Sequence, residues 1–178
     1  MIEIEREKTY LAKWIPGEIK GVRSEIIRDI YVPETVEHAT LRLRAKGEKY
    51  EITKKEPVVE DDSTKQNEHT ITLIKAEYDA LAACSKKQFA KRRYYCKIGG
   101  YDAEVDVYLE DLEGLVVIDF EFTTDEQMAL FKPPEVCLAD VSQDALIAGG
   151  KLAGRTYEDL RPELEAYGYE PLKLKGEA

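Results

Sequence analysis

Apolar and polar residues alternate with a period of two along most of the first 123 residues. Such alternation is typical of β-strands, in which successive side chains point to opposite faces of a sheet. It predicts eight strands, at residues 2–11, 24–32, 39–45, 49–55, 68–73, 90–97, 103–109 and 115–123. Gly47, Gly99 and Gly100 fall between consecutive strands, where a tight hairpin turn needs a residue that adopts positive φ. The pattern therefore predicts a mostly antiparallel sheet.

Helical spacing and capping signals fill the remaining stretches. They predict helices at residues 75–83, 124–131, 142–147 and 156–167. A hydroxyl opens three of these helices, because Thr124, Ser142 and Thr156 can each accept a hydrogen bond from a free backbone N–H of the first turn. Gly149 and Gly150 are expected to stop the third helix. We expect the helices to cover the apolar outside of the sheet.

The polar face of the strands is charged, and the charges are sorted by strand. Three strands carry acidic residues on that face, namely Glu5 and Glu7, Asp106, and Asp119 and Glu121. Three others carry basic residues, namely Arg42 and Arg44, Lys55, and Lys91 and Arg93. A face that merely meets water more often mixes both signs along one strand. The sorting therefore raises the question of whether these side chains share an interior.

Two arrangements fit the alternation. An open antiparallel sheet can pack one face on helices and leave the other in water, with no site at all. Alternatively, eight strands can close into a barrel, which removes the exposed edges and places the charged face inside. Charges buried without partners cost several kcal/mol per ion, so such an interior must hold water, metal or ligand. We expect the second arrangement: an α+β fold with a closed, mostly antiparallel eight-stranded barrel, as a single domain over residues 1–178.

Composition narrows the classes of function. The 178 residues suit one domain, and their net charge of −10 argues against a nucleic-acid duplex as partner, because duplex binding needs a basic field. No apolar run approaches the roughly 18 residues of a membrane span, and no signal-peptide pattern is present. The three cysteines lack metal-ligand spacing. We expect a cytoplasmic protein that binds neither duplex nor membrane. The sequence leaves the oligomeric state open, a homodimer included.

Several segments resemble, in order, the motifs of the CYTH, or triphosphate tunnel metalloenzyme, superfamily. In the first half of the chain they are Glu5–Leu11 for E-x-E-x-K, Leu41–Arg44 for L-R-x-R and Ile52–Lys55 for L-T-x-K. In the second half they are Lys91–Tyr94 for K-x-R-Y, Glu104–Tyr108 for the strand ending in V-D, Gly114–Phe122 for G-L-x-x-x-E-x-E-F with an Asp for the first Glu, and Asp140-Val141-Ser142 for the late E-V-T. Each motif alone is short and weakly specific, but their ordered set covers about residues 3 to 160.

The resemblance implies a fold, an activity and a set of site residues. Members of the superfamily hydrolyse inorganic tripolyphosphate or thiamine triphosphate, or cyclise ATP, with Mg²⁺ or Mn²⁺. It implies that the metal ligands are Glu5, Glu7, Asp106, Asp119 and Glu121. It implies that the phosphate ligands are Arg42, Arg44, Lys55, Lys91 and Arg93, with Lys151 as an additional one. The function expected is a metal-dependent hydrolase of a small triphosphate, which is inorganic tripolyphosphate, thiamine triphosphate or a nucleotide. The ligand expected in the charged tunnel is accordingly a small triphosphate or polyphosphate. The alternatives are a class IV-type adenylate cyclase and a non-catalytic polyphosphate or nucleotide binder.

One position departs from the motif. Thr9 stands where the superfamily has its lysine, beside Glu5 and Glu7 in the strand expected to be catalytic. In a regular strand the neighbouring Lys8 points to the opposite face. A register that groups Glu3 and Glu5 with Lys8 requires a β-bulge. The lysine is the third element of the motif. Its replacement is therefore compatible with slow hydrolysis and also with binding that is not followed by cleavage.

Overall fold

The strands are the dominant elements of the fold. A computed structural model describes residues 2–60 and 62–174. The strands are β1 (Ile2–Ala12), β2 (Ser24–Val32), β3 (Leu41–Lys46), β4 (Lys49–Pro57), β5 (Lys65–Leu73), β6 (Gln88–Ile98), β7 (Tyr101–Tyr108), β8 (Val116–Glu121) and β9 (Cys137–Asp140). All eight predicted strands are present, with ends within three residues of the predicted ones. The short strand β9 was not predicted.

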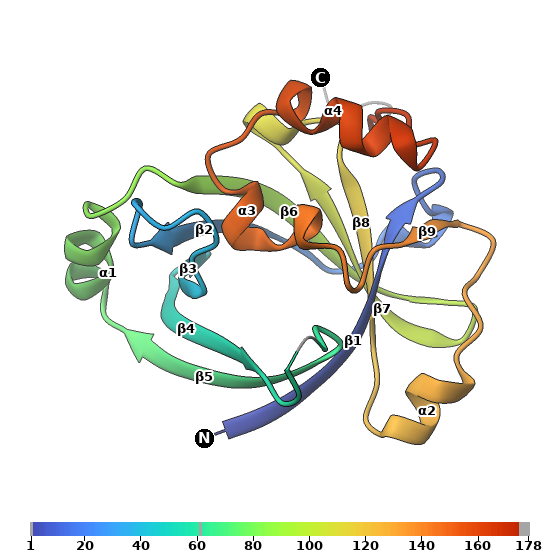
Figure 1. Ribbon diagram of the computed structural model, residues 1–178, viewed down its shortest axis with the longest axis horizontal. Helices are drawn as coiled ribbons and strands as arrows, with labels where there is room; N and C mark the ends of the chain where they lie inside the picture. Colours follow the sequence, from blue (N-terminus) through green and yellow to red (C-terminus); the bar gives the residue numbers. More distant parts are fainter. Residues whose placement is uncertain (1, 61, 175–178) are drawn as a thin grey trace.

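Eight of the strands close into a barrel. Their order is β5-β4-β3-β2-β6-β7-β8-β1, and β1 pairs back with β5. Strand β1 closes the ring because its first half, residues 2–6, pairs with β5 while residues 7–11 pair with β8. Every pairing is antiparallel, and β9 attaches to the end of β1 outside the ring. Figure 1 shows the closed ring of strands. The predicted barrel is confirmed, and the open sheet with one face in water is excluded.

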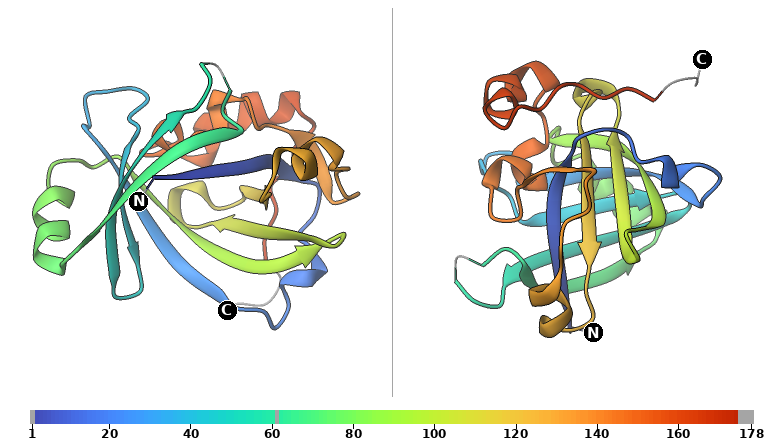
Figure 2. Two further views of the ribbon diagram at one scale, coloured as in Figure 1. Left: turned by 90° about the horizontal axis from the view of Figure 1, so that it is seen from below. Right: turned by 90° about the vertical axis from the view of Figure 1, so that its right-hand side faces the viewer.

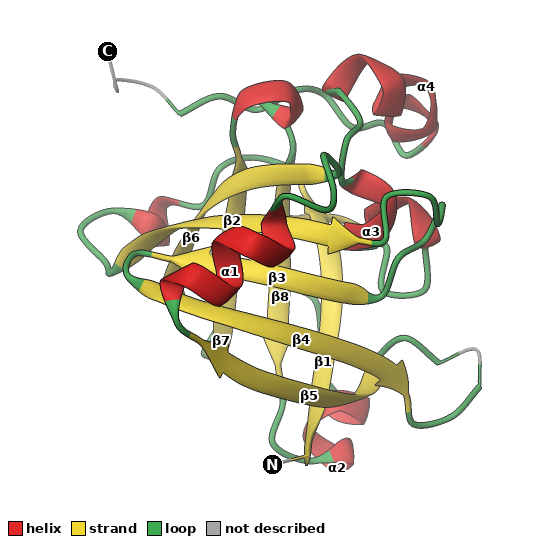
Figure 3. Ribbon diagram, turned by 90° about the vertical axis from the view of Figure 1, so that its left-hand side faces the viewer, coloured by secondary structure: helices red, strands yellow, loops and turns green. Residues whose placement is uncertain are grey.

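Four α-helices lie outside the ring of strands. They are α1 (Lys75–Ala82), α2 (Asp125–Leu130), α3 (Gly149–Leu152) and α4 (Tyr157–Ala166). Helix α1 lies across the outer face of the barrel, where Tyr78 packs against Ile30 and Leu43 (Figure 3). Helices α2 and α4 lie at opposite ends of the molecule (Figure 2). None of the helices in the described part of the chain is long and apolar enough to cross a membrane.

Helix capping follows the prediction at two of three hydroxyls. The Thr124 hydroxyl accepts from the Gln127 N–H at 3.2 Å, and Thr156 caps α4 in the same way. The expected cap at Ser142 is wrong. Its hydroxyl instead fastens β9 to β1, since it accepts from the Thr9 N–H at 3.0 Å. Asp144 caps a short 3-10 helix in its place.

The prediction that Gly149 and Gly150 end a helix is also wrong, because they begin α3. A Cβ on Gly149 would lie 1.9 Å from the Tyr31 hydroxyl, and one on Gly150 would lie 2.0 Å from the Ala39 carbonyl oxygen. The absence of side chains at these two positions therefore lets α3 approach the barrel closely. Helices α3 and α4 share one apolar cluster with Tyr31 and Phe89 of the barrel strands.

Candidate functional site

The barrel encloses a charged cavity of about 530 Å³. Eleven of the predicted site residues line it: Glu5, Glu7, Thr9, Arg42, Arg44, Lys55, Lys91, Arg93, Asp106, Asp119 and Glu121. They come from strands β1, β3, β4, β6, β7 and β8, and in each strand they occupy alternate positions. Lys151 is not among the described lining residues. Its ammonium group instead pairs with the exposed Glu37 carboxylate at 3.1 Å.

Arg44 is held by an aspartate that sequence reasoning missed. Its Nε and Nη2 atoms donate to the two carboxylate oxygens of Asp29, each at 2.7 Å. Asp29 lies on β2, opposite Arg44 in the strand pairing, and is only 1% exposed. Although burial opposes it, the Arg44 guanidinium holds the pKa of the Asp29 carboxyl well below its usual range. This buried pair fixes one side of the cavity wall.

Arg42 is left without such a partner. The residue is 9% exposed, and its Nε is the one buried side-chain nitrogen or oxygen in the described residues that lacks a hydrogen-bond partner. Burying a cationic donor without a partner is costly, so native structures normally supply one. The cavity side of Arg42 is therefore suited to an anion that brings hydrogen-bond acceptors.

Asp106 already has two cationic partners. Lys91 donates to one of its oxygens, and Arg93 binds both of them, with Nε and Nη2 at 2.7 and 2.6 Å. Against the effect of burial, these two cations hold the pKa of Asp106 well below its usual range. Arg93 also approaches Asp119, with 3.5 Å between nitrogen and oxygen. Both Asp106 oxygens are thus taken by the protein itself, whereas the resemblance implies a metal ligand at this position.

Lys55 occupies the opposite, acidic side. Its ammonium group donates to Glu5 and lies 3.5 Å from Glu68 and 4.0 Å from Glu7. Glu68 comes from β5 and was not predicted as a site residue. Although burial alone would lower the pKa of Lys55, the Glu7 and Glu5 carboxylates raise it. Lys55 is therefore a charged ammonium group that three carboxylates surround.

Three carboxylates have raised pKa values. Burial is the main cause, and it raises the pKa of Glu7 and Asp119 above the usual range. Partial burial, followed by repulsion from Glu104, raises the pKa of Glu121 to about 7. Glu7 stands directly opposite Glu121 in the pairing of β1 with β8. Neighbouring buried carboxylates repel one another, so a cation between them would favour their charged forms.

Thr9 lies at the predicted lysine position and faces the cavity. Its hydroxyl donates to Asp119 at 2.8 Å. Residues 2–6 pair regularly with β5 and residues 7–11 with β8. Glu5, Glu7 and Thr9 all line the cavity, so there is no bulge between them that would turn Lys8 inward. Lys8 points outward, with its ammonium group 5.9 Å from the centre of the Phe131 ring. Glu3, which the alternative register would also place inside, has a side chain outside the part of the chain that the structure describes.

The charge balance of the lining bears on metal binding. Nine carboxylates but only six Lys or Arg side chains line the cavity. Carboxylate oxygens are the donors that Mg²⁺ and Mn²⁺ prefer, so the chemistry of this donor set suits a hard divalent cation. Yet within residues 2–60 and 62–174, no group of three or more His, Cys, Asp or Glu side chains is already arranged to hold a metal ion. The carboxylates instead contact the protein's own cations.

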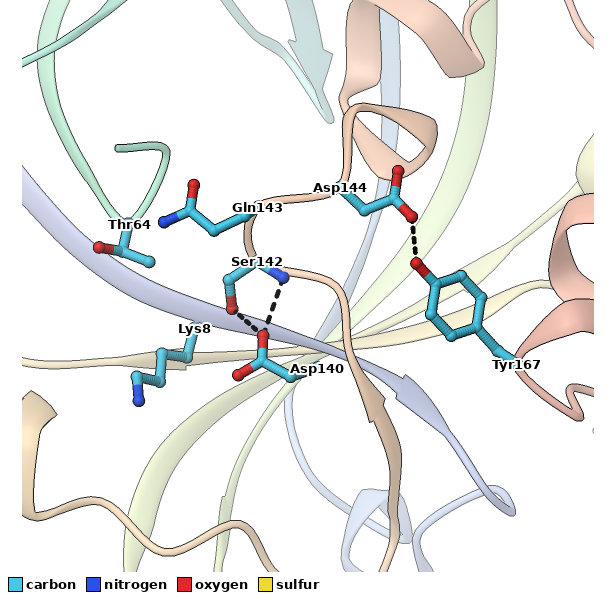
Figure 4. A pocket seen from close by; sticks show the side chains of 7 residues that line it. All are labelled: Lys8, Thr64, Asp140, Ser142, Gln143, Asp144 and Tyr167. Atoms are coloured by element: carbon cyan, nitrogen blue, oxygen red, sulfur yellow. Dashed lines mark hydrogen bonds between the residues drawn. The ribbon is translucent and has the colours of Figure 1, made fainter. Parts of the chain in front are cut away.

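A second cavity, of about 610 Å³, lies on the outer side of β1 (Figure 4). It is lined by Lys8, Asp140, Asp144 and other polar residues, and it contains none of the predicted site residues. The hydrogen bonds drawn there join Ser142 to Asp140 and Tyr167 to Asp144. These contacts hold the loop after β9, which separates the second cavity from the interior of the barrel.

The chain is similar to known proteins in both sequence and structure. No protein-family model matches the chain. The chain is 28% identical over 146 residues to an inorganic triphosphatase of Nitrosomonas europaea, which covers 81% of this chain and 91% of the relative. It also resembles the crystal structure of an inorganic triphosphatase, with a TM-score of 0.61 and 23% identity over 86% of this chain and 95% of the other. The structure of a Bacillus halodurans protein assigned as an adenylate cyclase matches with a TM-score of 0.54 and 16% identity. The match covers 99% of this chain and 96% of the other. The two structural likenesses show a shared fold.

Proposed function

We propose that this chain, whose fold and sequence similarity fit the triphosphate tunnel superfamily, is a divalent-metal-dependent triphosphatase that acts on a small triphosphate in the barrel. One observation carries the proposal: the buried Arg42 side chain lines the cavity, and its Nε lacks a hydrogen-bond partner. A triphosphate supplies the oxygen acceptors that this cation lacks. The similarity to an inorganic triphosphatase makes tripolyphosphate the first substrate to test.

The cationic side chains would bind and orient the phosphates. Arg42 has an Nε without a partner, whereas Asp29 takes Nε and Nη2 of Arg44 and leaves its Nη1 for a phosphate oxygen. Lys91 and Arg93 would neutralise charge further along the chain of phosphates. Phosphoryl transfer depends mainly on such positioning and charge neutralisation. Lys151 would contribute only after leaving Glu37, because that pair holds it outside the described lining.

The acidic side would hold the metal. The ligands we propose are Glu5, Glu7, Asp119 and Glu121, with Asp106 joining them only if Lys91 and Arg93 release it. When bound, Mg²⁺ or Mn²⁺ would supply the positive charge that offsets the phosphate oxygens. The raised pKa values of three of these carboxylates support a cation site, because a divalent ion would relieve their mutual repulsion.

Binding without cleavage is the second candidate, and Thr9 favours it. A threonine hydroxyl donates one hydrogen bond, here to Asp119, whereas a lysine would add a positive charge and three donors. A terminal phosphate carries roughly −1.5 to −2 charges near neutral pH, so the missing cation weakens its attraction to this side of the cavity. The two candidates differ in phosphate release rather than in affinity.

A screen of three substrates tests the proposal. Tripolyphosphate, thiamine triphosphate and ATP are each incubated with Mg²⁺, Mn²⁺ or a chelator, and both phosphate and cyclic AMP are measured. We expect metal-dependent phosphate release and no cyclic AMP. Arg42→Met should raise the KM by about tenfold or more, since it removes a charged hydrogen-bond donor. Arg28→Met is the matched control, because Arg28 pairs with Glu110 on the outside of the barrel.

Cyclic AMP without phosphate release would favour the cyclase. Tight tripolyphosphate binding without release would favour the non-catalytic binder. A KM that Arg42→Met leaves equal to that of the control would contradict the role given to Arg42.

A further inference from the structure

Lys55 stands where a metal ion would stand. Its ammonium group donates to Glu5 and lies 4.0 Å from Glu7, and both carboxylates belong to the proposed metal ligands. Glu68 approaches from the neighbouring strand at 3.5 Å and completes the set of three. The Lys55 side chain is 23% exposed, so these contacts are made largely out of water. At such distances a second cation would meet strong repulsion from the ammonium group.

The lining as a whole also disfavours a free anion. Nine carboxyl groups but only six Lys or Arg side chains line it, so acidic groups outnumber the cations that could receive an anion. Several of the cations are already engaged, since Asp29 holds Arg44 and Asp106 holds both Lys91 and Arg93. A triphosphate that entered alone would add more negative charge to this interior. The cavity thus resists both a lone divalent cation and a lone polyanion.

We propose that Lys55 is an internal counter-ion, which occupies the carboxylate side of the cavity until a divalent cation and a triphosphate enter together. The incoming cation takes the Glu5 and Glu7 carboxylates, and the released Lys55 ammonium turns to a phosphate oxygen. The ion pair of Lys55 with Glu5 is thereby exchanged for two, one between the cation and the carboxylates and one between Lys55 and a phosphate oxygen. Glu68 loses Lys55 but keeps its hydrogen bond from Thr70. The inference rests on the proposed function, because it assigns the order in which that site fills.

The exchange couples the two ligands. Metal alone must displace Lys55 with nothing to receive it, so it binds weakly. With triphosphate present the displaced ammonium gains a new partner, and each ligand strengthens the binding of the other by the same factor. Couplings of this kind are typically about 5- to 150-fold. The arrangement also explains why the described carboxylates are not already grouped around a metal position.

Isothermal titration of the full chain tests this without relying on turnover. Mn²⁺ is titrated into the wild type, Lys55→Met and Lys55→Arg, first alone and then with tripolyphosphate present. Lys54→Met is the matched control, because Lys54 is the next residue on β4 but is exposed and pairs with Glu56 on the outer face. Circular dichroism and melting confirm that each variant is folded.

We expect Lys55→Met to bind Mn²⁺ alone about tenfold tighter or more, since the competing charge is gone. Tripolyphosphate should then improve Mn²⁺ affinity less than it does in the wild type. Lys55→Arg should keep weak binding of metal alone, because it keeps the charge, and Lys54→Met should match the wild type. If Lys55→Met fails to fold, the comparison of Lys55→Gln with Lys55→Arg replaces it.

Mn²⁺ affinity that is unchanged or weaker in the neutral variants would overturn the inference. So would wild-type Mn²⁺ binding that tripolyphosphate does not improve. These results leave the proposed function intact if the wild type still releases phosphate from tripolyphosphate. Conversely, the wild type could bind Mn²⁺ more tightly with tripolyphosphate present and yet release no phosphate. That result would support the counter-ion role of Lys55 and contradict the proposed hydrolase activity.

Discussion

Asp29→Asn removes the buried negative charge that holds Arg44 in place. The two residues form a bidentate pair at 2.7 Å, with side-chain exposures of 1% for Asp29 and 11% for Arg44. Asparagine keeps the shape but accepts only with its one carbonyl oxygen, and its NH₂ group would face the guanidinium. Arg42 and Lys91 lie close enough to lower the pKa of Asp29, so the substitution leaves three cations without their shared anion.

The magnitude follows from the burial of the pair. Removing one partner of a buried ion pair costs about 3 to 5 kcal/mol, and the retained hydrogen bond places this substitution near 3 kcal/mol. For a chain of this length, that lowers the melting temperature by about 6 to 12 °C. The control is Asp102→Asn, whose pair with Lys97 has side chains 70% and 65% exposed. Such a pair contributes less than about 1 kcal/mol.

Thermal unfolding by circular dichroism, with urea unfolding beside it, measures both variants. Sulfate or tripolyphosphate should restore part of the stability lost in Asp29→Asn, because the freed Arg44 then gains an anion. The same anions should have little effect on the Asp102→Asn control beyond their effect on the wild type. Asp29→Asn melting within about 1 °C of the wild type would refute the reasoning, as would an absence of anion rescue.

Three further predictions concern the acidic side of the cavity. Thr9→Lys should speed single-turnover phosphate release by about tenfold, because it adds a cation beside Asp119. An unchanged rate would show that the threonine does not limit turnover. Without metal, the pKa of Glu121 is about 7 in the folded state, against 4.5 for the same group when unperturbed. Because the folded state then holds a proton that the unfolded state has lost, the free energy of unfolding should fall as the pH rises between these two values. Melting temperatures across that window, with and without Mg²⁺ and tripolyphosphate together, measure this fall and its reversal by the bound ion. A flat profile would contradict it. Glu121→Gln should lose most of the metal-induced rise in melting temperature, and a full rise in this variant would remove Glu121 from the ligand set.

The barrel and the orientation of its side chains could be predicted because both follow from backbone geometry. Alternation of Arg42 and Arg44 with apolar neighbours assigns the two arginines to one face, and the structure places both in the cavity. The same parity places Thr9 inside and Lys8 outside, as the regular pairing of β1 with β8 confirms. Closure of the sheet was inferred from strand number and charge sorting together. Neither observation alone separates a barrel from an open sheet.

Partnerships across the cavity could not be predicted, because they depend on the register between strands. Asp29 was not predicted as a site residue. Its strand places the apolar Ile27 on the same face, so the sequence of that strand does not show a run of charged positions on that face. The engagement of Asp106 by two cations is likewise invisible in one strand's sequence. Ser142 has the chemistry of a cap, but tertiary contact with β1 uses its hydroxyl instead. Strand β9 has only four residues, too few for a period to appear.

The central claim is that this cavity hydrolyses a triphosphate with the help of a divalent cation. The most direct measurement is phosphate release from tripolyphosphate by the purified protein, with Mg²⁺ or Mn²⁺ in one series and a chelator in the other. We expect release of one phosphate per tripolyphosphate that requires the metal, with a KM that is about tenfold higher or more in Arg42→Met. Equal release in the presence of chelator, or neither release nor micromolar binding of tripolyphosphate with either metal, would contradict it.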